Sequence, residues 1–266
     1  MGETGFSAAE DIARAFVGAR RDRRALTTYP GPAPATMDQA YQVQDAALRQ
    51  DGRTVGGWKL GKINPPHLER LGANRLAGPI FTDQIVSADG DAAADMAVFR
   101  DGFAAAEAEF LLRIGTAPDP AKSDYTIETA TRLIDAVHAG IEVASSPYPG
   151  INADGPPVTA SDYGNNNGLV IGASIDGWRD ADLNAWSVEL LINGTVIGSA
   201  CAADMLDGPF GAAAFLFNLA ARRGIALQAG QWISSGAVTG VHPVAIGDVC
   251  EARFDDRYPV RCTIIG

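Results

Sequence analysis

The chain has 266 residues, with 21 Lys and Arg against 32 Asp and Glu, and its formal net charge at pH 7 is −11. At roughly 100–200 residues per domain, this length suits one large domain, or a compact domain with a smaller attachment. The acidic surplus argues against nucleic-acid binding, because neutralising phosphates requires clustered Lys and Arg.

The cysteines and the apolar segments limit the cellular setting. Cys201, Cys250 and Cys262 are an odd number and lack Cys-x-x-Cys spacing, so neither a disulfide framework nor a zinc knuckle is indicated. No apolar run approaches the ~20 residues that span a bilayer, and the N-terminus lacks a basic segment followed by an apolar one. We therefore expect a soluble cytoplasmic protein with no membrane and no nucleic-acid partner.

The first expected elements in chain order are two helices. Residues 8–26 carry apolar side chains at helical spacing and end in a run of arginines, where cations suit the helix dipole. Thr36 followed by Gln39 predicts a capping box that opens a second helix, and residues 51–52 close it. This pair predicts a helical cap on the rest of the chain.

Beyond Gly57, short apolar runs separated by Gly and Pro predict strands. The runs are 106–114, 141–144, 169–171, 188–192, 232–234 and 260–264. The Asn193-Gly194 pair predicts a two-residue hairpin and hence antiparallel pairing. Two further helices are expected, one from near Thr126 to just before residue 140 and one from Pro209 to Gly224.

Hairpins outnumber strand–helix–strand units in this pattern, which favours an α+β fold with a rolled, mostly antiparallel β-sheet over a doubly wound fold. The glycine-rich segment 56–61 has neither the Gly-x-Gly-x-x-Gly nor the Gly-Lys-Ser/Thr pattern of a phosphate-binding loop. The sequence therefore does not suggest a nucleotide cofactor.

Glu107 and Glu109 are the first candidates for chemistry. On a strand they point to one face, roughly 6.5–7 Å apart, while the alternate apolar residues fill the other face. Two such carboxylates repel each other unless a cation lies between them. A solvent-exposed face, continued by Arg113, is the simpler interpretation for an isolated Glu-x-Glu strand, and a divalent-metal site is the alternative.

A third acid, Glu142, lies within the short apolar run 141–144. It is either exposed, paired or a metal ligand, because burying an unpaired carboxylate is costly. Three carboxylates that converge would supply the hard oxygen ligands that suit Mg²⁺ or Mn²⁺. Sequence spacing alone leaves that convergence open.

Lys59 stands between Trp58 and Leu60, with glycines on both sides that permit close backbone approach. It either extends along an apolar surface into solvent, or faces the metal cavity and binds a carboxylate or relays a proton. The histidines lack metal-ligand spacing, so a His-based zinc site is not expected. We expect His138 to lie at a helix C-terminus, and His67 is a weak candidate for a general base.

Several short segments follow one another in an order and spacing that matter more than any single piece. They are residues 57–61, 71–72, 78–81, 107–109, 141–143, 229–237 and 246–249. On these segments, over roughly residues 10–266, the chain resembles the 2-keto-4-pentenoate hydratase branch of the fumarylacetoacetate hydrolase superfamily.

The resemblance implies a rolled β-sheet catalytic domain, which we place at residues 57–266, after an N-terminal helical part at residues 1–56. It also implies a homo-oligomer, a small-molecule 2-oxo acid substrate and bound Mg²⁺ or Mn²⁺. On the matching positions, Glu107, Glu109 and Glu142 are the expected metal ligands. The expected catalytic and substrate-binding residue is Lys59, and Ser235 and Thr239 are further expected substrate-binding residues.

Two loops depart from the pattern that hydratases commonly show. Residues 74–77 lack the usual acidic residue, and residues 163–168 read Tyr-Gly-Asn-Asn-Asn-Gly where Asp-Asn-Ala-Ser-Ser-Gly is common.

Three hypotheses for the function follow. The first hypothesis is a metal-dependent hydratase acting on a 2-hydroxy-2,4-dienoate in aromatic or steroid catabolism. The second keeps the site and changes the reaction to decarboxylation of a 2-oxo-3-enedioate or C–C hydrolysis of an acylpyruvate. The third is a catalytically silent subunit that binds a keto acid or stabilises a partner.

Overall fold

The computed structural model describes residues 3–88 and 93–266, and side chains from residue 8 onward. The α-helices are α1 Glu3–Arg21, α2 Met37–Asp51, α3 His67–Leu71, α4 Ile127–Thr131, α5 Pro156–Ser161 and α6 Gly208–Arg223. The strands are β1 Val55–Lys62, β2 Arg75–Phe81, β3 Ile85–Ser87, β4 Ala94–Ala97, β5 Phe103–Ile114, β6 Ile134–Ser146, β7 Asn166–Ser174, β8 Ser187–Ile192, β9 Thr195–Cys201, β10 Trp232–Ser234, β11 His242–Pro243, β12 Val249–Phe254 and β13 Tyr258–Ile265.

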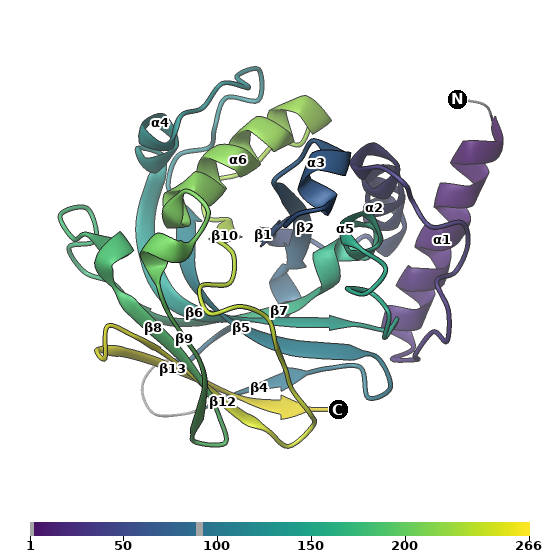
Figure 1. Ribbon diagram of the computed structural model, residues 1–266. Helices are drawn as coiled ribbons and strands as arrows, with labels where there is room; N and C mark the ends of the chain where they lie inside the picture. Colours follow the sequence, from purple (N-terminus) through teal and green to yellow (C-terminus); the bar gives the residue numbers. More distant parts are fainter. Residues whose placement is uncertain (1–2, 89–92) are drawn as a thin grey trace.

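Two curled sheets form the body of the protein. The larger sheet has the strand order β2-β1-β10-β5-β6-β7-β3, with β11 added beside β5, and the smaller sheet has the order β4-β13-β12-β8-β9. The pairs β1–β10, β3–β7 and β4–β13 are parallel, and the other pairs in the described part of the chain are antiparallel. The expected α+β fold with a rolled, mostly antiparallel sheet is confirmed (Figure 1).

The sheets pack face to face through one shared apolar core. Phe110 on β5 meets Phe254 on β12 edge to face, with 5.0 Å between ring centroids, and both side chains are fully buried. The long strands β5, β6 and β7 cross the middle of Figure 1, with the smaller sheet on one side and α6 on the other. This core fixes β5 and β6 from one face and leaves their other face available for polar side chains.

The N-terminal helices form a second, smaller cluster. Thr36 caps α2 as expected, its side chain accepting from the Gln39 backbone N–H, and Gly52 ends the helix in the left-handed conformation. α1 ends earlier than expected because Arg23 takes a positive φ of 50°. The apolar faces of both helices pack on Phe81 and Tyr163. The division into residues 1–56 and 57–266 stays a prediction.

The expected helix from Thr126 to residue 139 is wrong in extent. Only one turn, α4, is helical, and β6 begins at Ile134. Apolar side chains then recur at every second residue from Val137 to Val143, a strand period, and β-branched residues favour strands. His138 therefore lies on β6 and not at a helix C-terminus, and its Nδ1 is 2.8 Å from the Gly172 carbonyl oxygen.

The other local expectations agree with the structure. α6 begins at Gly208, beside Pro209, and ends before Gly224. Asn193 and Gly194, with φ values of 50° and 79°, connect the antiparallel strands β8 and β9. Within residues 3–88 and 93–266, no helix combines the length and the apolarity that crossing a membrane requires.

Candidate metal centre and substrate cavity

Three glutamates come together on two neighbouring strands. Glu107 and Glu109 lie on one face of β5, and Glu142 on β6 is the direct register partner of Glu107. The three residues each offer a carboxylate oxygen within 4.8 Å of the others. All three are buried, with Glu109 and Glu142 fully inaccessible. The solvent-exposed interpretation of the Glu-x-Glu strand is therefore wrong, whereas the role of the three as metal ligands stays a prediction.

The chemistry of the cluster fits a divalent cation. When all three carboxylates are ionised, they and the ammonium of Lys59 leave two negative charges unbalanced within the cluster, which one divalent ion would balance. Glu109 Oε1 is buried and has no hydrogen-bond partner among the described residues, so it is available as a ligand. Carboxylate oxygens are the donors that Mg²⁺ and Mn²⁺ prefer.

The electrostatics of the cluster reflect this excess of negative charge. Burial, together with the charges of Glu142 and Glu107, raises the pKa of Glu109 well above its ordinary value. Burial also raises the pKa of Glu142 to about 7, although Lys59 opposes the shift. Without a cation, Glu109 and Glu142 thus tend to retain protons near neutral pH.

Lys59 lies on β1 and is 3% exposed. Its Nζ is 3.0 Å from Glu142 Oε2 and donates to Asn165 Oδ1 at 3.2 Å. Burial disfavours its charged form, but the charges of Glu107, Glu142 and Glu109 outweigh burial and raise the pKa of Lys59. Lys59 is therefore a protonated side chain beside the glutamates, and the solvated alternative is wrong.

Asn165 and Asn166 complete the cluster, and the sequence analysis did not assign them to it. Asn166 Nδ2 donates to Glu142 Oε1 at 2.7 Å, and Asn165 accepts from Lys59. Both belong to the 163–168 segment that departs from the hydratase pattern. The difference of residues 163–168 from the hydratase pattern was the one sequence feature that pointed to them. Nothing in the local sequence indicates which side chains they contact.

Close backbone packing brings this segment to Lys59. Gly78 on β2 is the register partner of Lys59, and a Cβ atom at Gly78 would lie 1.9 Å from the Tyr163 carbonyl oxygen. Gly164 has a φ of +62°, and a Cβ there would be 3.0 Å from Lys59 Cδ. Gly78 requires glycine because the Tyr163 backbone occupies the space of a Cβ atom, and a Cβ atom at Gly164 would crowd the Lys59 side chain.

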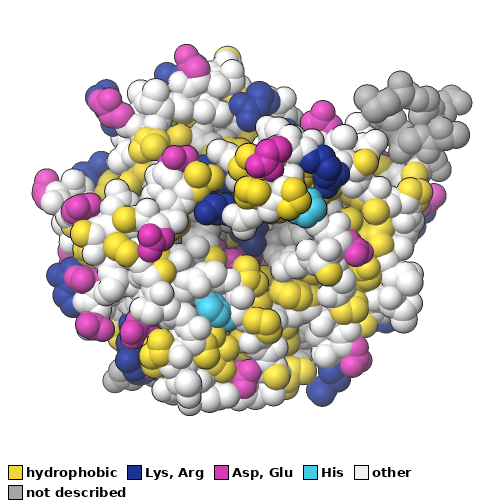
Figure 2. All heavy atoms as spheres, viewed as in Figure 1, with side chains coloured by type: hydrophobic (Ala, Val, Ile, Leu, Met, Phe, Trp, Pro, Cys, Tyr) yellow, Lys and Arg dark blue, Asp and Glu magenta, His cyan; other side chains and the backbone are white. Residues whose placement is uncertain are grey.

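A cavity of about 610 Å³ opens beside the cluster and is lined by Lys59 and Glu107. Figure 2 shows the hollow at the centre of this face, with basic and acidic side chains inside it. Ser235 and Thr239 line the cavity, and their hydroxyls are buried without a hydrogen-bond partner in the described part of the chain. The neighbouring Ser234 hydroxyl instead donates to Glu109 Oε2 at 2.5 Å. The expected substrate-binding residues therefore share one cavity, and their role in binding stays a prediction.

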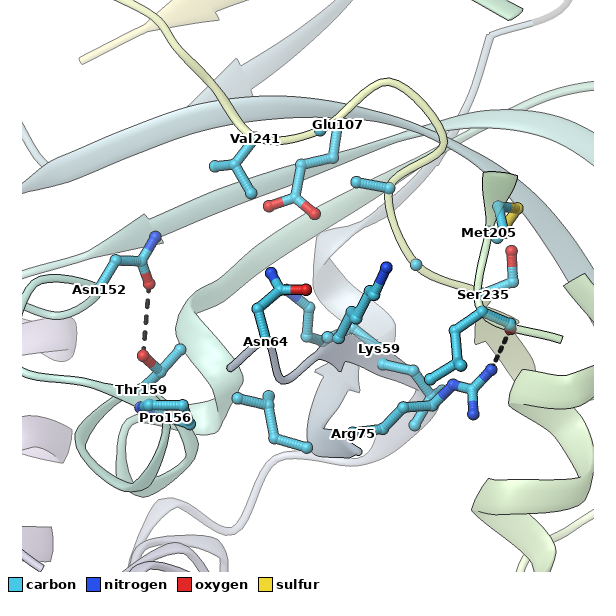
Figure 3. A pocket seen from close by; sticks show the side chains of 18 of the residues that line it. Lys59, Asn64, Arg75, Glu107, Asn152, Pro156, Thr159, Met205, Ser235 and Val241 are labelled. Carbon is cyan, nitrogen blue, oxygen red and sulfur yellow. Dashed lines mark hydrogen bonds between the residues drawn. The ribbon is translucent and has the colours of Figure 1, made fainter. Parts of the chain in front are cut away.

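Cations line the cavity beyond the glutamates. In Figure 3, Arg75 lies on the opposite side of the cavity from Glu107, with Lys59 between them. Arg75 donates to the Leu206 carbonyl oxygen, and its Nη1 is 3.4 Å from Asp207 Oδ2. Lys62, its register partner on β1, also lines the cavity.

His67 lines the same cavity. Its Nδ1 is 3.2 Å from Arg70 Nη2, and a guanidinium can only donate. Nδ1 must therefore accept this hydrogen bond, and the neutral ring carries its proton on Nε2. Nε2 is then a hydrogen-bond donor.

Comparison with known proteins supports the resemblance. No family model matches the chain. It is 28% identical to a 4-oxalocrotonate decarboxylase of Pseudomonas sp. (strain CF600), over 97% of this chain and 95% of the relative. It is 27% identical to 2-keto-4-pentenoate hydratase 1 of Dechloromonas aromatica (strain RCB), over 88% of this chain and 84% of the relative.

Solved structures agree on the fold. The 4-oxalocrotonate decarboxylase from Pseudomonas putida G7, complexed with magnesium and adipate, aligns with a TM-score of 0.80 at 22% identity, covering 97% of each chain. A fumarylpyruvate hydrolase from Pseudomonas aeruginosa, in complex with Mn²⁺ and pyruvate, aligns with a TM-score of 0.58 at 12% identity, covering 78% of this chain and 88% of that one.

The rolled sheet and the buried glutamate cluster define a protein with the fumarylacetoacetate hydrolase fold. In sequence, the chain is similar to 2-keto-4-pentenoate hydratases and 4-oxalocrotonate decarboxylases. The expected divalent cofactor agrees with the cluster and with the metals in these neighbouring structures.

Proposed function

We propose that the protein is a divalent-metal-dependent enzyme that converts a 2-oxo acid with a conjugated double bond through the enolate of that acid. The observation that carries this proposal is the cluster of Glu107, Glu109 and Glu142 beside the protonated Lys59, at the wall of a cavity of about 610 Å³. This volume is ample for a five- or six-carbon acid.

Each group in the cavity would have a distinct role in the reaction. The three glutamates would hold the cation, whose positive charge would polarise the 2-oxo group and stabilise negative charge on its oxygen. The Lys59 ammonium, which reaches the cluster within 3.0 Å of Glu142, would bind a substrate oxygen or deliver a proton to it. The free hydroxyls of Ser235 and Thr239 would orient the substrate by hydrogen bonds.

Among the reactions that share this enolate, the geometry favours decarboxylation of a 2-oxo-3-enedioate. The bond between the terminal carboxylate and the adjacent CH₂ breaks, CO₂ leaves, and the electron pair moves through the double bond to the 2-oxo oxygen. This step needs an electron sink and no base, which suits a cavity whose lysine is protonated. Arg75, on the side of the cavity away from Glu107, would attract the terminal carboxylate. Lys62, which also lines the cavity, would add to this attraction. Adipate, also a dicarboxylate, is present in the P. putida G7 decarboxylase structure.

Hydration of a 2-hydroxy-2,4-dienoate to a 4-hydroxy-2-oxo acid is the second candidate. The hydratase relatives support it, and Lys59 would protonate the dienol carbon. Hydrolytic C–C cleavage is less well supported, because a His–Glu pair would have to activate water and His67 Nδ1 is engaged by Arg70.

Two substrates separate these reactions. With Mg²⁺, the purified protein should release CO₂ from 2-oxo-3-hexenedioate and should leave the ultraviolet absorbance of 2-hydroxy-2,4-pentadienoate unchanged. Loss of the dienol absorbance without CO₂ release would favour hydration. If neither substrate nor an acylpyruvate reacts, the enzymatic proposal is wrong and the silent keto-acid-binding subunit takes its place.

A further inference from the structure

Arg20, in the last turn of α1, is 8% exposed. Its guanidinium donates hydrogen bonds to the end of β6 and to residues 162–167. Its Nε and Nη2 donate to Asp162 Oδ1 and Oδ2 at 2.6 and 2.9 Å. Its Nη1 donates to the Asn166 carbonyl oxygen at 3.1 Å and to Asn167 Oδ1 at 3.2 Å. Its Nη2 also reaches the Ser145 carbonyl oxygen at 3.2 Å. One side chain of an N-terminal helix thus joins the end of β6 to the segment that precedes β7.

Asp162, like Arg20, is buried and makes several hydrogen bonds. It is 1% exposed, and its Oδ2 also accepts from Ser146 Oγ at 2.6 Å. A bidentate pair between Arg and a carboxylate defines both distance and orientation. Asp162 is therefore a fixed point from which the following residues start.

The residues that follow Asp162 are strained. Tyr163, Gly164 and Asn165 have successive φ values of 55°, 62° and 58°. Left-handed backbone is unfavourable for a residue with a Cβ atom, and such strain persists only where the surroundings impose it. Here Arg20 and Asp162 secure the start of the strained turn, and the Arg20 bond to the Asn166 carbonyl secures its end.

The turn delivers its next side chains to the glutamate cluster. Asn165 Oδ1 accepts from Lys59 Nζ, and Asn166 Nδ2 donates to Glu142 Oε1. A continuous chain of contacts thus runs from α1, through Asp162 and the turn, to Lys59 and Glu142.

We propose that Arg20 and Asp162 are positioning residues for the metal centre: they hold the strained turn 163–165 so that Asn165 and Asn166 orient Lys59 and Glu142. The proposal rests on the function proposed above, because it assumes that the cluster binds a divalent cation. It assigns the N-terminal helix a part in tuning metal affinity, in addition to covering the sheet.

Arg20→Lys tests this role, because lysine keeps the charge but loses the fork that grips Asp162. The matched control is Arg223→Lys on α6, which weakens another Arg–Asp ion pair, 2.6 Å to Asp45, that joins α6 to α2. The Arg223 side chain is 9% exposed, and Asp45 is partly exposed. Mn²⁺ affinity is measured by electron paramagnetic resonance well below the unfolding temperature of each variant. Arg20→Lys should weaken Mn²⁺ binding roughly tenfold or more, in the range seen for groups that orient metal ligands. Arg223→Lys should leave the affinity within about twofold, even if both lower the unfolding temperature.

Hydrogen exchange on the unaltered protein keeps the test decisive if Arg20→Lys does not fold. Coupling between sites is reciprocal, so Mn²⁺ should slow amide exchange in the last turn of α1 and in residues 162–167, but not in the last turn of α6. Equal Mn²⁺ affinity in Arg20→Lys and the unaltered protein, or unchanged exchange in α1, would overturn the positioning role alone. Failure of the unaltered protein to bind Mn²⁺ would overturn the metal centre as well.

Discussion

Glu107 and Glu142 are direct register partners across the antiparallel strands β5 and β6, so two carboxylates oppose each other inside the protein. Like charges directly opposite on paired strands are destabilising, and burial adds the cost of removing each carboxylate from water. Lys59, 3.0 Å from Glu142, offsets one charge. The remaining repulsion is what a divalent cation would relieve.

Replacing Glu107 tests the metal centre directly. Glu107→Gln removes one of the three proposed ligands and one charge, so it should weaken Mg²⁺ binding by more than the roughly 10–100-fold loss that follows removal of an outer partner. The metal-free variant should unfold at the same temperature as the unaltered protein or higher, because the repulsion with Glu142 is gone. Titration calorimetry and thermal unfolding measure both effects. The control is Glu69→Gln, an exposed position on α3. Unchanged metal binding and turnover in Glu107→Gln would contradict the enzyme proposal.

Lys59→Met should separate catalysis from metal binding. Turnover should fall by about 10²–10⁴-fold, the usual contribution of a proton-transfer group. Stabilisation by Mg²⁺ should equal or exceed that of the unaltered protein, because the variant has more unbalanced negative charge. Steady-state rates and unfolding temperatures with and without Mg²⁺ check this, with Lys122→Met, a half-exposed lysine, as control. A turnover within tenfold of the unaltered protein would remove Lys59 from the mechanism.

The raised pKa of Glu142 predicts how metal-free stability changes with pH. Its pKa rises from an ordinary value of 4.5 to about 7 in the folded protein, so the folded state binds more protons than the unfolded state between those values. Its contribution to stability is fully present below pH 4.5 and is lost as pH rises through about 7. The metal-free protein should therefore lose free energy of unfolding over this window, relative to Glu142→Gln.

Divalent cations should show the opposite trend, because ligands must lose their protons to bind a metal. Stabilisation by Mg²⁺ should grow from pH 5 to pH 8 and vanish in Glu142→Gln. Urea unfolding of both proteins at several pH values, with and without Mg²⁺, measures this. A flat difference between the two metal-free proteins across the window would show that Glu142 titrates normally.

Two glycine substitutions test the packing that brings the turn to Lys59. Gly78→Ala places a Cβ atom 1.9 Å from the Tyr163 carbonyl oxygen, so it should destabilise the protein by about 1–3 kcal/mol and also weaken metal binding. Gly18→Ala, inside α1 with no atom within 4 Å of the added Cβ, should stabilise by about 0.5–1 kcal/mol. Denaturant unfolding compares them. Equal free energies of unfolding for Gly78→Ala and Gly18→Ala would mean that the 163–165 turn does not pack closely against β2.

Local patterns in the sequence were sufficient for much of the architecture. The α2 cap at Thr36, the hairpin at Asn193-Gly194 and the shared face of Glu107 and Glu109 each depend on residues close in sequence, so short-range rules predict them. The prediction of a helix beyond Thr126 was wrong because it, too, used only residues close in sequence. Its first turn has a helical cap, but pairing along β5 imposes a strand from Ile134 onward, and that pairing is not visible locally.

The sequence by itself determined which residue types were available for metal chemistry, and the spacing that puts Glu107 and Glu109 on one face. Only the tertiary structure decided that these acids are buried, that Glu142 opposes Glu107, and that Asn165 and Asn166 reach Lys59 and Glu142. Those facts depend on strand register and on contacts such as that of Arg20 with Asp162, between residues far apart in the chain. Burial is also a property of the whole fold, and it distinguishes an ordinary surface pattern of acids from a buried cluster that suits a divalent cation.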